Sequence, residues 1–211
     1  LRRLKSDKAD SAMIAEYAMR NYDRAELYIP LNESLSQLRE LFLFRQMLVR
    51  QKHGFQVRRG EKNRAMEKSS VKTAISQIGR HMVNECNKQI EKVERRIKDI
   101  IDGDEELKRT YELITTIPGI GTQNAVCLLT FTNNFTRFGY NARKIACYYG
   151  IAPFGRDSGT SVHSDPHVHY MANRMLKSML TQAALASIRC CAPIAHYYHR
   201  LIALGKRSKS H

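Results

Sequence analysis

A long and narrow apolar stripe is the feature that most limits how this chain can fold. Between residues 71 and 100, apolar side chains recur at steps of mostly three and four, which keeps them on one side of a helix over about eight turns. The stripe consists of Val71, Ile75, Ile78, Met82, Cys86, Ile90, Val93, Ile97 and Ile100. A seam this narrow cannot close a globular core by itself, so it predicts pairing with another long helix.

The partner helix is predicted to begin near residue 31. Apolar residues recur there at helical spacing, at Leu31, Leu35, Leu38, Leu41, Phe42 and Met47 or Leu48. The pattern is interrupted between Gly54 and Gly60, and the second arm breaks at Asp102-Gly103-Asp104. We therefore expect an antiparallel coiled-coil hairpin over residues 31–104, which is typical of a spacer or an oligomerisation element.

Shorter elements flank this hairpin and make the expected fold mainly α. Before it, a short helix is predicted over 11–20, with Ser6 or Asp7 as its N-cap. After it, the sequence changes to shorter helices with more Gly and Pro, so we place domains at 1–30, 31–104 and 105–211. The later segments expected are helices over 105–115, 122–131, 141–149 and 169–191, the last stopping before Pro193, and an irregular or strand-containing loop over 150–168.

The charge of the chain favours a polyanionic partner. Lys and Arg number 35 against 20 Asp and Glu, which gives a formal charge of +15. Charge alone leaves nucleic acid, an anionic membrane surface or an acidic protein open. No apolar run is long enough to span a bilayer and no signal peptide pattern opens the chain, so we expect a cytoplasmic protein.

The turn Ile117-Pro118-Gly119-Ile120-Gly121, between two apolar helices, is similar to a helix-hairpin-helix nucleic-acid-binding element. Glycine lets the backbone take unusual φ values and approach a phosphate, and the N–H groups opening the next helix attract the anion. The residues expected to contact DNA here are Gly119, Ile120, Gly121 and Thr122. Such contacts read the phosphate backbone and carry no sequence choice. An ordinary interhelical turn capped by glycine is the alternative.

Two carboxylates near the start of the chain form a second candidate site. Asp7 and Asp10 are three residues apart, so on a helix they face the same side, as joint coordination of Mg²⁺ beside a phosphate requires. Acidic residues are also favoured in the first turn of a helix by its dipole and by capping. The pair is therefore a metal site or a helix start.

A third candidate lies in the loop after Gly150. Ser158 stands beside Gly159, where its hydroxyl can be presented freely, and Arg156 can steady a phosphate while that hydroxyl attacks. Loops are also rich in Ser and Gly for conformational reasons. Both interpretations are open on these residues alone.

Taken in order, these features resemble one family, the DEDD transposases of bacterial insertion sequences, which are related to the Piv-type DNA invertases and guided by a structured bridge RNA. The order is Asp-x-x-Asp, coiled-coil arms, Ile-Pro-Gly-Ile-Gly, then Ala-x-x-Gly-Ile-Ala-Pro and Ser-Gly-Thr-Ser. The resemblance covers nearly the whole chain and is most specific over 111–190. The residue types over 143–153 and 171–178 are also typical of the family.

The resemblance implies a fold and roles for individual residues. Residues 1–30 would be the end of a resolvase-like RNase H domain, with Asp7 and Asp10 as the last two of four Mg²⁺-binding acids. The other two would lie upstream of Leu1, so we expect an N-terminally truncated chain that does not cut DNA by itself. Ser158 would be the nucleophile, with Ser161 as second candidate. Arg143, Lys144 and Arg156 are the basic side chains expected to contact DNA.

The implied activity is DNA cleavage and rejoining through a covalent phosphoserine, on double-stranded DNA and with a bridge RNA as guide. A homodimer or homotetramer through the coiled coil is expected. Two alternatives differ in chemistry. One is a non-catalytic helix-hairpin-helix nucleic-acid-binding protein, and the other is a metal-dependent Holliday-junction nuclease in which the acids cut and the C-terminal half docks.

Overall fold

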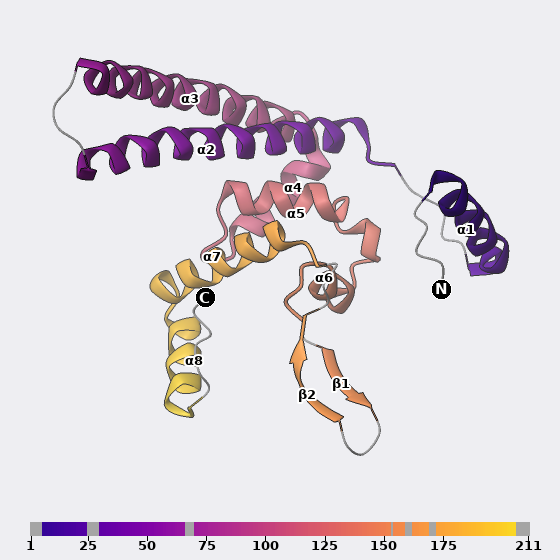
Figure 1. Ribbon diagram of the computed structural model, residues 1–211. Helices are drawn as coiled ribbons and strands as arrows, with labels where there is room; N and C mark the ends of the chain where they lie inside the picture. Colours follow the sequence, from indigo (N-terminus) through magenta and orange to yellow (C-terminus); the bar gives the residue numbers. More distant parts are fainter. Residues whose placement is uncertain are drawn as a thin grey trace. The chain divides into compact units, whose positions relative to one another are not determined.

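The computed structural model describes residues 6–24, 30–65, 70–152, 154–158, 162–168 and 172–205. Within them it is mainly α, as predicted, with eight α-helices, two short 3-10 helices and one antiparallel pair of strands (Figure 1). Contacts divide the chain into two compact units, Leu1–Pro30 and Leu31–His211. No described helix is both long and apolar enough to cross a lipid bilayer.

The first unit contains helix α1 (Asp7–Arg20) and a 3-10 turn, η1 (Tyr22–Arg24). Ser6 is the N-cap, and its hydroxyl accepts a hydrogen bond from the Ala9 N–H at 3.3 Å, which confirms the predicted helix and one of its two candidate caps. Helix α1 buries none of its residues, and Met13, Ile14 and Tyr17 are each at least 62% exposed. The described residues of this unit therefore supply no core for the helix.

The predicted hairpin is present at the start of the second unit. Helices α2 (Glu33–Ala65) and α3 (Ser70–Asp102) run antiparallel and side by side (Figure 1). Arg45 of α2 and Glu94 of α3 form an ion pair across the hairpin at 2.7 Å. The buried side chains of α3 are Val83, Cys86, Ile90, Val93, Ile97 and Ile101.

Two details of the hairpin differ from the prediction. Helix α2 continues without a break through Gly54 and Gly60, because glycine inside a helix costs only about 1 kcal/mol and the neighbouring residues support the helix. The buried stripe of α3 also shifts by one residue at its ends, so that Val83 and Ile101 are more buried than Met82 and Ile100. A helix of 3.6 residues per turn drifts against a fixed repeat of three and four.

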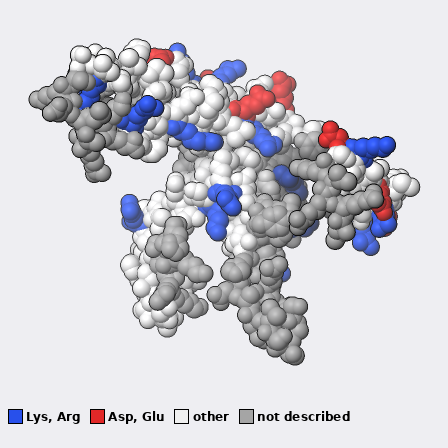
Figure 2. All heavy atoms as spheres, in the orientation of Figure 1, with Lys and Arg blue, Asp and Glu red and all other residues white. Residues whose placement is uncertain are grey.

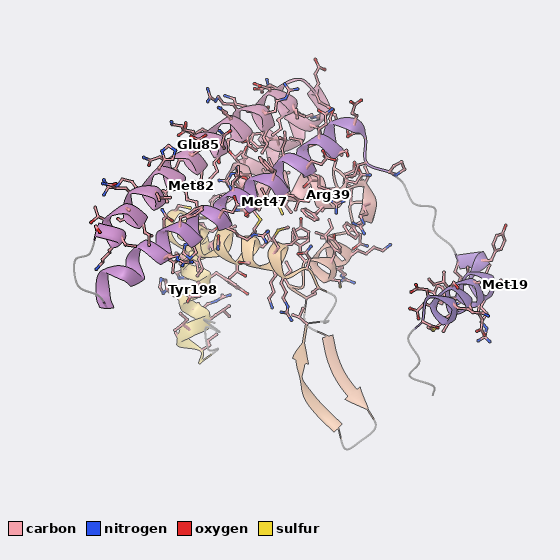
Figure 3. All side chains as sticks on the ribbon, turned by 45° about the horizontal axis from the view of Figure 1, so that its top comes forward. Met19, Arg39, Met47, Met82, Glu85 and Tyr198 are labelled. Atoms are coloured by element: carbon pink, nitrogen blue, oxygen red, sulfur yellow. The ribbon has the colours of Figure 1, made fainter. Side chains whose placement is uncertain are left out.

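Helices α4 (Glu105–Thr115) and α5 (Thr122–Thr132) follow, within one residue of the predicted bounds. Helix α5 is the centre of the unit, because it is buried along most of its length and packs against α2, α4 and α7. Phe42 of α2 meets Phe131 of α5 edge to face at 6.2 Å, and the Arg39 guanidinium lies 5.0 Å from the centre of the same ring. Arg39 is labelled on α2 in Figure 3. The hairpin and the C-terminal helices therefore share one core.

The remaining elements carry the segments of functional interest. They are η2 (Thr136–Phe138), α6 (Ala142–Tyr148), β1 (Phe154–Ser158), β2 (Val162–His167), α7 (Arg174–Cys190) and α8 (Ala192–Ala203). The helix predicted over 169–191 is wrong at its start, since Asn173 caps α7 with its side chain. The predicted stop before Pro193 is confirmed, since α7 ends at Cys190, and Pro193 lies in the first turn of a further helix, α8, where its missing N–H costs nothing.

Candidate nucleic-acid interface

The C-terminal half of the chain carries almost no negative charge. No Asp or Glu occurs between Leu113 and Arg156, and residues 113–211 hold eleven Lys and Arg against two Asp. Figure 2 shows blue over α7 and no red over the visible surface of α7 and α8. A phosphate backbone near this half meets attraction without the local repulsion that carboxylates would cause.

The glycine turn between α4 and α5 is shaped by packing against α7. Gly119 has φ +88, and a Cβ built there would lie 2.5 Å from the Ala183 carbonyl oxygen and closer still to the Ser187 hydroxyl. That hydroxyl donates a hydrogen bond to the Pro118 carbonyl oxygen at 2.5 Å. Packing against α7 therefore requires glycine at position 119, independently of any phosphate that approaches the turn.

Gly121 is different, because it faces open space and is the N-cap of α5 without a side chain to cap the helix. Helices α4, α6 and α7 each begin with such a side chain, from Asp104, Asn141 and Asn173 respectively. The first N–H groups of α5 thus lack the acceptor that the other three helices have. A helix start of this kind can donate to a phosphate oxygen.

A pocket of about 440 Å³ adjoins the start of α5. Its wall includes Thr122 of α5, whose hydroxyl shares a 2.9 Å hydrogen bond with the hydroxyl of Tyr111. Two carboxylates also line it, and each has a basic partner: Glu94 pairs with Arg45 at 2.7 Å and Asp102 with Lys108 at 3.4 Å. Their charges are compensated, so they do not oppose an anion as isolated carboxylates would.

Helix α6 presents the predicted basic residues Arg143 and Lys144. Both are exposed, and their backbone N–H groups donate to the Asn141 side chain at 3.0 Å and 3.2 Å. Because the Asn141 side chain already accepts hydrogen bonds from these N–H groups, the long basic side chains are the groups of α6 that can contact an anion. They are placed on one short helix beside the loop that follows α5.

Arg137, in that loop, was not predicted as a site residue. Its guanidinium lies 4.9 Å from the centre of the Tyr148 ring and 5.4 Å from that of Phe138. Stacking of this kind fixes the orientation of an exposed cation. The absence of acidic residues around it is the sequence signal that could have identified it.

The strand pair carries the predicted nucleophile. Ser158 is the last residue of β1 and pairs with Val162 of β2, while Arg156 pairs with Ser164. The described ends of the two strands thus meet at Ser158, next to the tip of the hairpin. Ser161, the second candidate, lies outside the described residues.

Gly150 lies before β1, where the chain packs closely against the segment that follows β2. It has φ +66, and a Cβ there would lie 2.5 Å from the Ala172 Cβ and 3.0 Å from a Val168 methyl group. The chain before β1 therefore packs against the chain after β2. Beside this contact, burial raises the pKa of the Tyr149 hydroxyl, and it raises the pKa of the Cys127 thiol in α5 to about 12. Both groups therefore stay neutral at pH 7.

Asp7 and Asp10 lie in the first turn of α1, in the other unit. Their three-residue spacing fits part of a Mg²⁺ coordination shell. Among the described residues, however, no group of three or more Asp, Glu, His or Cys is arranged to hold a metal ion. The described part of the chain thus supplies two carboxylates and not a complete metal site.

Comparison with known proteins links this geometry to a family. Residues 111–200, from α4 through the strand pair to α8, match the model of the Transposase IS116/IS110/IS902 family. After this match, residues 111–200 are called the transposase-family domain. The transposase-family domain includes the glycine turn, the basic helix α6 and Ser158, and the resemblance expected from the sequence is confirmed.

Individual relatives point the same way. The chain is 35% identical over 94 residues to the uncharacterized 43.6 kDa protein of insertion element IS110 from Streptomyces coelicolor. It is 26% identical over 183 residues to the pilin gene-inverting proteins of Moraxella bovis and Moraxella lacunata. The match covers 44% of this chain with the first relative and 87% with the other two. It spans 23% of the IS110 protein and 53% of each inverting protein.

Proposed function

We propose that this chain is part of a DNA recombinase that cuts and rejoins DNA through Ser158. The single observation that carries the proposal is the transposase-family domain, which spans Ser158 and the glycine turn in a half of the chain almost free of acidic residues. The likeness to two pilin gene-inverting proteins supports an activity on DNA segments. Double-stranded DNA is the proposed substrate.

The proposed step is a transfer of the phosphodiester to the protein. The Ser158 hydroxyl loses its proton and its oxygen attacks the phosphorus, while the bond from phosphorus to a deoxyribose oxygen breaks and that oxygen takes up a proton. The product is a phosphoserine ester and a free DNA hydroxyl. Attack by the hydroxyl of another strand end reverses the step and releases the serine. Each bond broken is replaced by an equivalent one, so no ATP is needed.

Positioning of the DNA is proposed to rest on backbone contacts. The uncapped start of α5 at Gly121 and Thr122 would donate to phosphate oxygens, and Arg143, Lys144 and Arg156 would supply charge. Contacts of this kind do not distinguish one sequence from another. A separate source of sequence choice is then needed, and we propose a structured bridge RNA for that role, as the family resemblance implies.

We also propose that α1 belongs to an RNase H-like domain in which Asp7 and Asp10 bind Mg²⁺ together with further acids. The apolar side chains that α1 leaves exposed support its packing against a larger domain. When bound, Mg²⁺ would neutralise charge at the reacting phosphate.

The first prediction is a covalent intermediate, and it separates the serine mechanism from its alternatives. A complete recombinase that contains this chain, incubated with labelled DNA and then denatured, should retain label on the protein, in a linkage at Ser158 identified by peptide mass. A metal-dependent junction nuclease cuts with a metal-bound water and leaves no adduct. A non-catalytic binding protein leaves the DNA uncut. Product formation without any adduct would contradict the proposed step.

The second proposal concerns assembly through the hairpin. On α3, four apolar residues near its N-terminal end are uncovered: Val71 is 64% exposed, Ile75 38%, Ile78 62% and Met82 36%. Met47 of α2 is also exposed, at 41%, and it is labelled with Met82 in Figure 3. These residues continue the stripe that pairs α3 with α2. We propose that the hairpin of a second copy covers them, because coiled-coil helices associate through such stripes.

Ile78→Glu tests this assembly. The charged side chain should raise the dissociation constant of the oligomer at least about 30-fold, since a buried unpaired carboxylate is as costly as the loss of an interface hot spot. Sedimentation equilibrium of the chain measures it. Leu113→Glu is the matched control, because Leu113 is 70% exposed on α4, away from the hairpin stripe, and its replacement should not change the mass. A wild-type chain that is monomeric at high concentration would refute the proposal.

A further inference from the structure

Tyr140 stands out among the exposed residues of the transposase-family domain. Its side chain is 70% exposed, and its backbone has φ +57, a left-handed conformation that disfavours a residue with a bulky side chain. Glycine would adopt this conformation without strain. With 70% of its side chain exposed, Tyr140 gains little packing to offset this backbone strain, which points to a role other than stabilising the fold.

The loop around Tyr140 is well defined despite this strain. The Tyr140 N–H donates to the Phe135 carbonyl oxygen at 3.2 Å, and the Asn141 N–H donates to the Phe138 carbonyl oxygen at 3.0 Å. Phe138 packs on Tyr148 of α6, with 5.1 Å between the ring centres. The loop is therefore anchored to α6 on both sides of Tyr140. The ring of Tyr140 makes no hydrogen bond or ring contact with any other described residue.

Basic residues flank Tyr140 in the sequence. Arg137 is three residues before Tyr140, and Arg143 and Lys144 are three and four residues after it, all three exposed. No carboxylate occurs anywhere in the segment from Leu113 to Arg156. An exposed aromatic ring among cations, without acids, is the combination that binds single-stranded nucleic acid, where the ring stacks on a base and the cations contact the phosphates.

We propose that Tyr140 stacks on an unpaired nucleic-acid base, with Arg137, Arg143 and Lys144 contacting the adjacent phosphates. The base must be unpaired because the faces of bases inside a duplex are already covered by their neighbours. The proposal deepens the nucleic-acid binding proposed above and rests on it. It adds a contact that the backbone-directed start of α5 does not provide. The strand can be DNA opened near the cleavage site or an unpaired segment of RNA.

The test is binding of the whole chain to a short labelled single strand, followed by fluorescence anisotropy at fixed salt concentration. Tyr140→Ala should weaken binding at least about five-fold, the lower end of the range for one stacked base. Tyr140→Phe, which keeps the ring, should bind as the wild type does. On a strand with abasic sites, Tyr140→Ala and the wild type should bind equally, because the charges are unchanged. Parallel DNA and RNA strands distinguish the two sources.

Two further variants separate binding from folding. Tyr140→Gly should melt at the same or a higher temperature than the wild type while binding the single strand as weakly as Tyr140→Ala. Tyr17→Ala is the matched control, since Tyr17 is also 70% exposed but lies on α1 with Asp10 and Glu16. Its binding should not change.

Three results would overturn the inference. Equal affinity of Tyr140→Ala and the wild type for the base-bearing strand refutes the stacking contact. If Tyr140→Ala loses the same affinity for abasic strands or for duplex DNA, the proposed contact with an unpaired base is refuted. A wild-type chain that binds no nucleic acid at low salt refutes the proposed function itself, and the inference with it.

Discussion

Replacing Ser158 by alanine is expected to abolish recombination by a complete recombinase that contains this chain. The loss should be at least roughly 10³-fold, because removal of a nucleophile eliminates the covalent step and the remaining groups can only bind and position the DNA. Conversion of a plasmid substrate to its recombined form measures the rate. DNA affinity should change little, since a hydroxyl contributes little to a contact surface dominated by basic side chains and backbone N–H groups.

Ser161→Ala is the matched control for this prediction. Ser158 is the last residue of β1, and Ser161 directly precedes β2 in the sequence but lies outside the described residues. The control should keep most of the recombination activity and should form the adduct. If Ser161→Ala is inactive and Ser158→Ala is active, the nucleophile is Ser161. Full activity in both variants would exclude a serine nucleophile in this hairpin.

Replacing Gly119 by alanine is expected to lower the free energy of unfolding by about 3 kcal/mol, the sum of a strained left-handed alanine and an overpacked contact. The residue has φ +88, and an added Cβ would meet the Ala183 carbonyl oxygen at 2.5 Å and the Ser187 side chain closer still. Backbone atoms of α7 cannot move aside without disturbing the helix. Urea denaturation of the chain measures the change.

Gly121→Ala is the control, two residues away in the same turn. It has φ −97 in the extended region, and a Cβ there would meet nothing within 4 Å. Its stability cost should stay within about 1 kcal/mol, the scale of replacing an N-cap glycine. Equal costs for the two variants would show that α7 does not pack on the turn as described. A loss of DNA affinity in Gly121→Ala, without loss of stability, would support a phosphate at the start of α5.

These two glycines of one turn have different surroundings in the structure. The sequence predicts a phosphate contact for the whole turn from Gly119 to Thr122. The structure gives Gly119 a contact with α7, whereas Gly121 and Thr122 open a helix that lacks a side-chain cap. The spacing of the motif does not distinguish a glycine that packs on another helix from one that opens a helix, since the contact with Ser187 joins residues far apart in the sequence.

Much of the secondary structure could be predicted, because it follows from local patterns. The hairpin and helices α4 and α5 lie close to their expected bounds, since periodic apolar residues and a glycine-containing break mark them in the sequence. The predicted stop before Pro193 is confirmed, since α7 ends at Cys190. Helix α8 was not predicted, because a proline can follow the end of one helix and also lie in the first turn of the next.

The candidate site was only partly predictable. Arg143 and Lys144 were named because they lie in a family motif, and they are exposed on α6 as such a role requires. Arg137 and Tyr140 were missed, because a single Arg or Tyr carries no periodic signal. They become candidate site residues through the stacking of Arg137 on Tyr148 and the φ of Tyr140, which are properties of the folded chain.

The sequence by itself determined the helical hairpin, the basic character of the C-terminal half and the similarity of residues 111–200 to a transposase family. These follow from periodicity, composition and motif, each of which is local or additive along the chain. Only the tertiary structure decided that α2 shares a core with α5 through Phe42 and Phe131, and that Gly119 packs on α7. An apolar stripe specifies that a helix face must be buried but not which distant helix buries it, because burial is non-directional and many partners satisfy it.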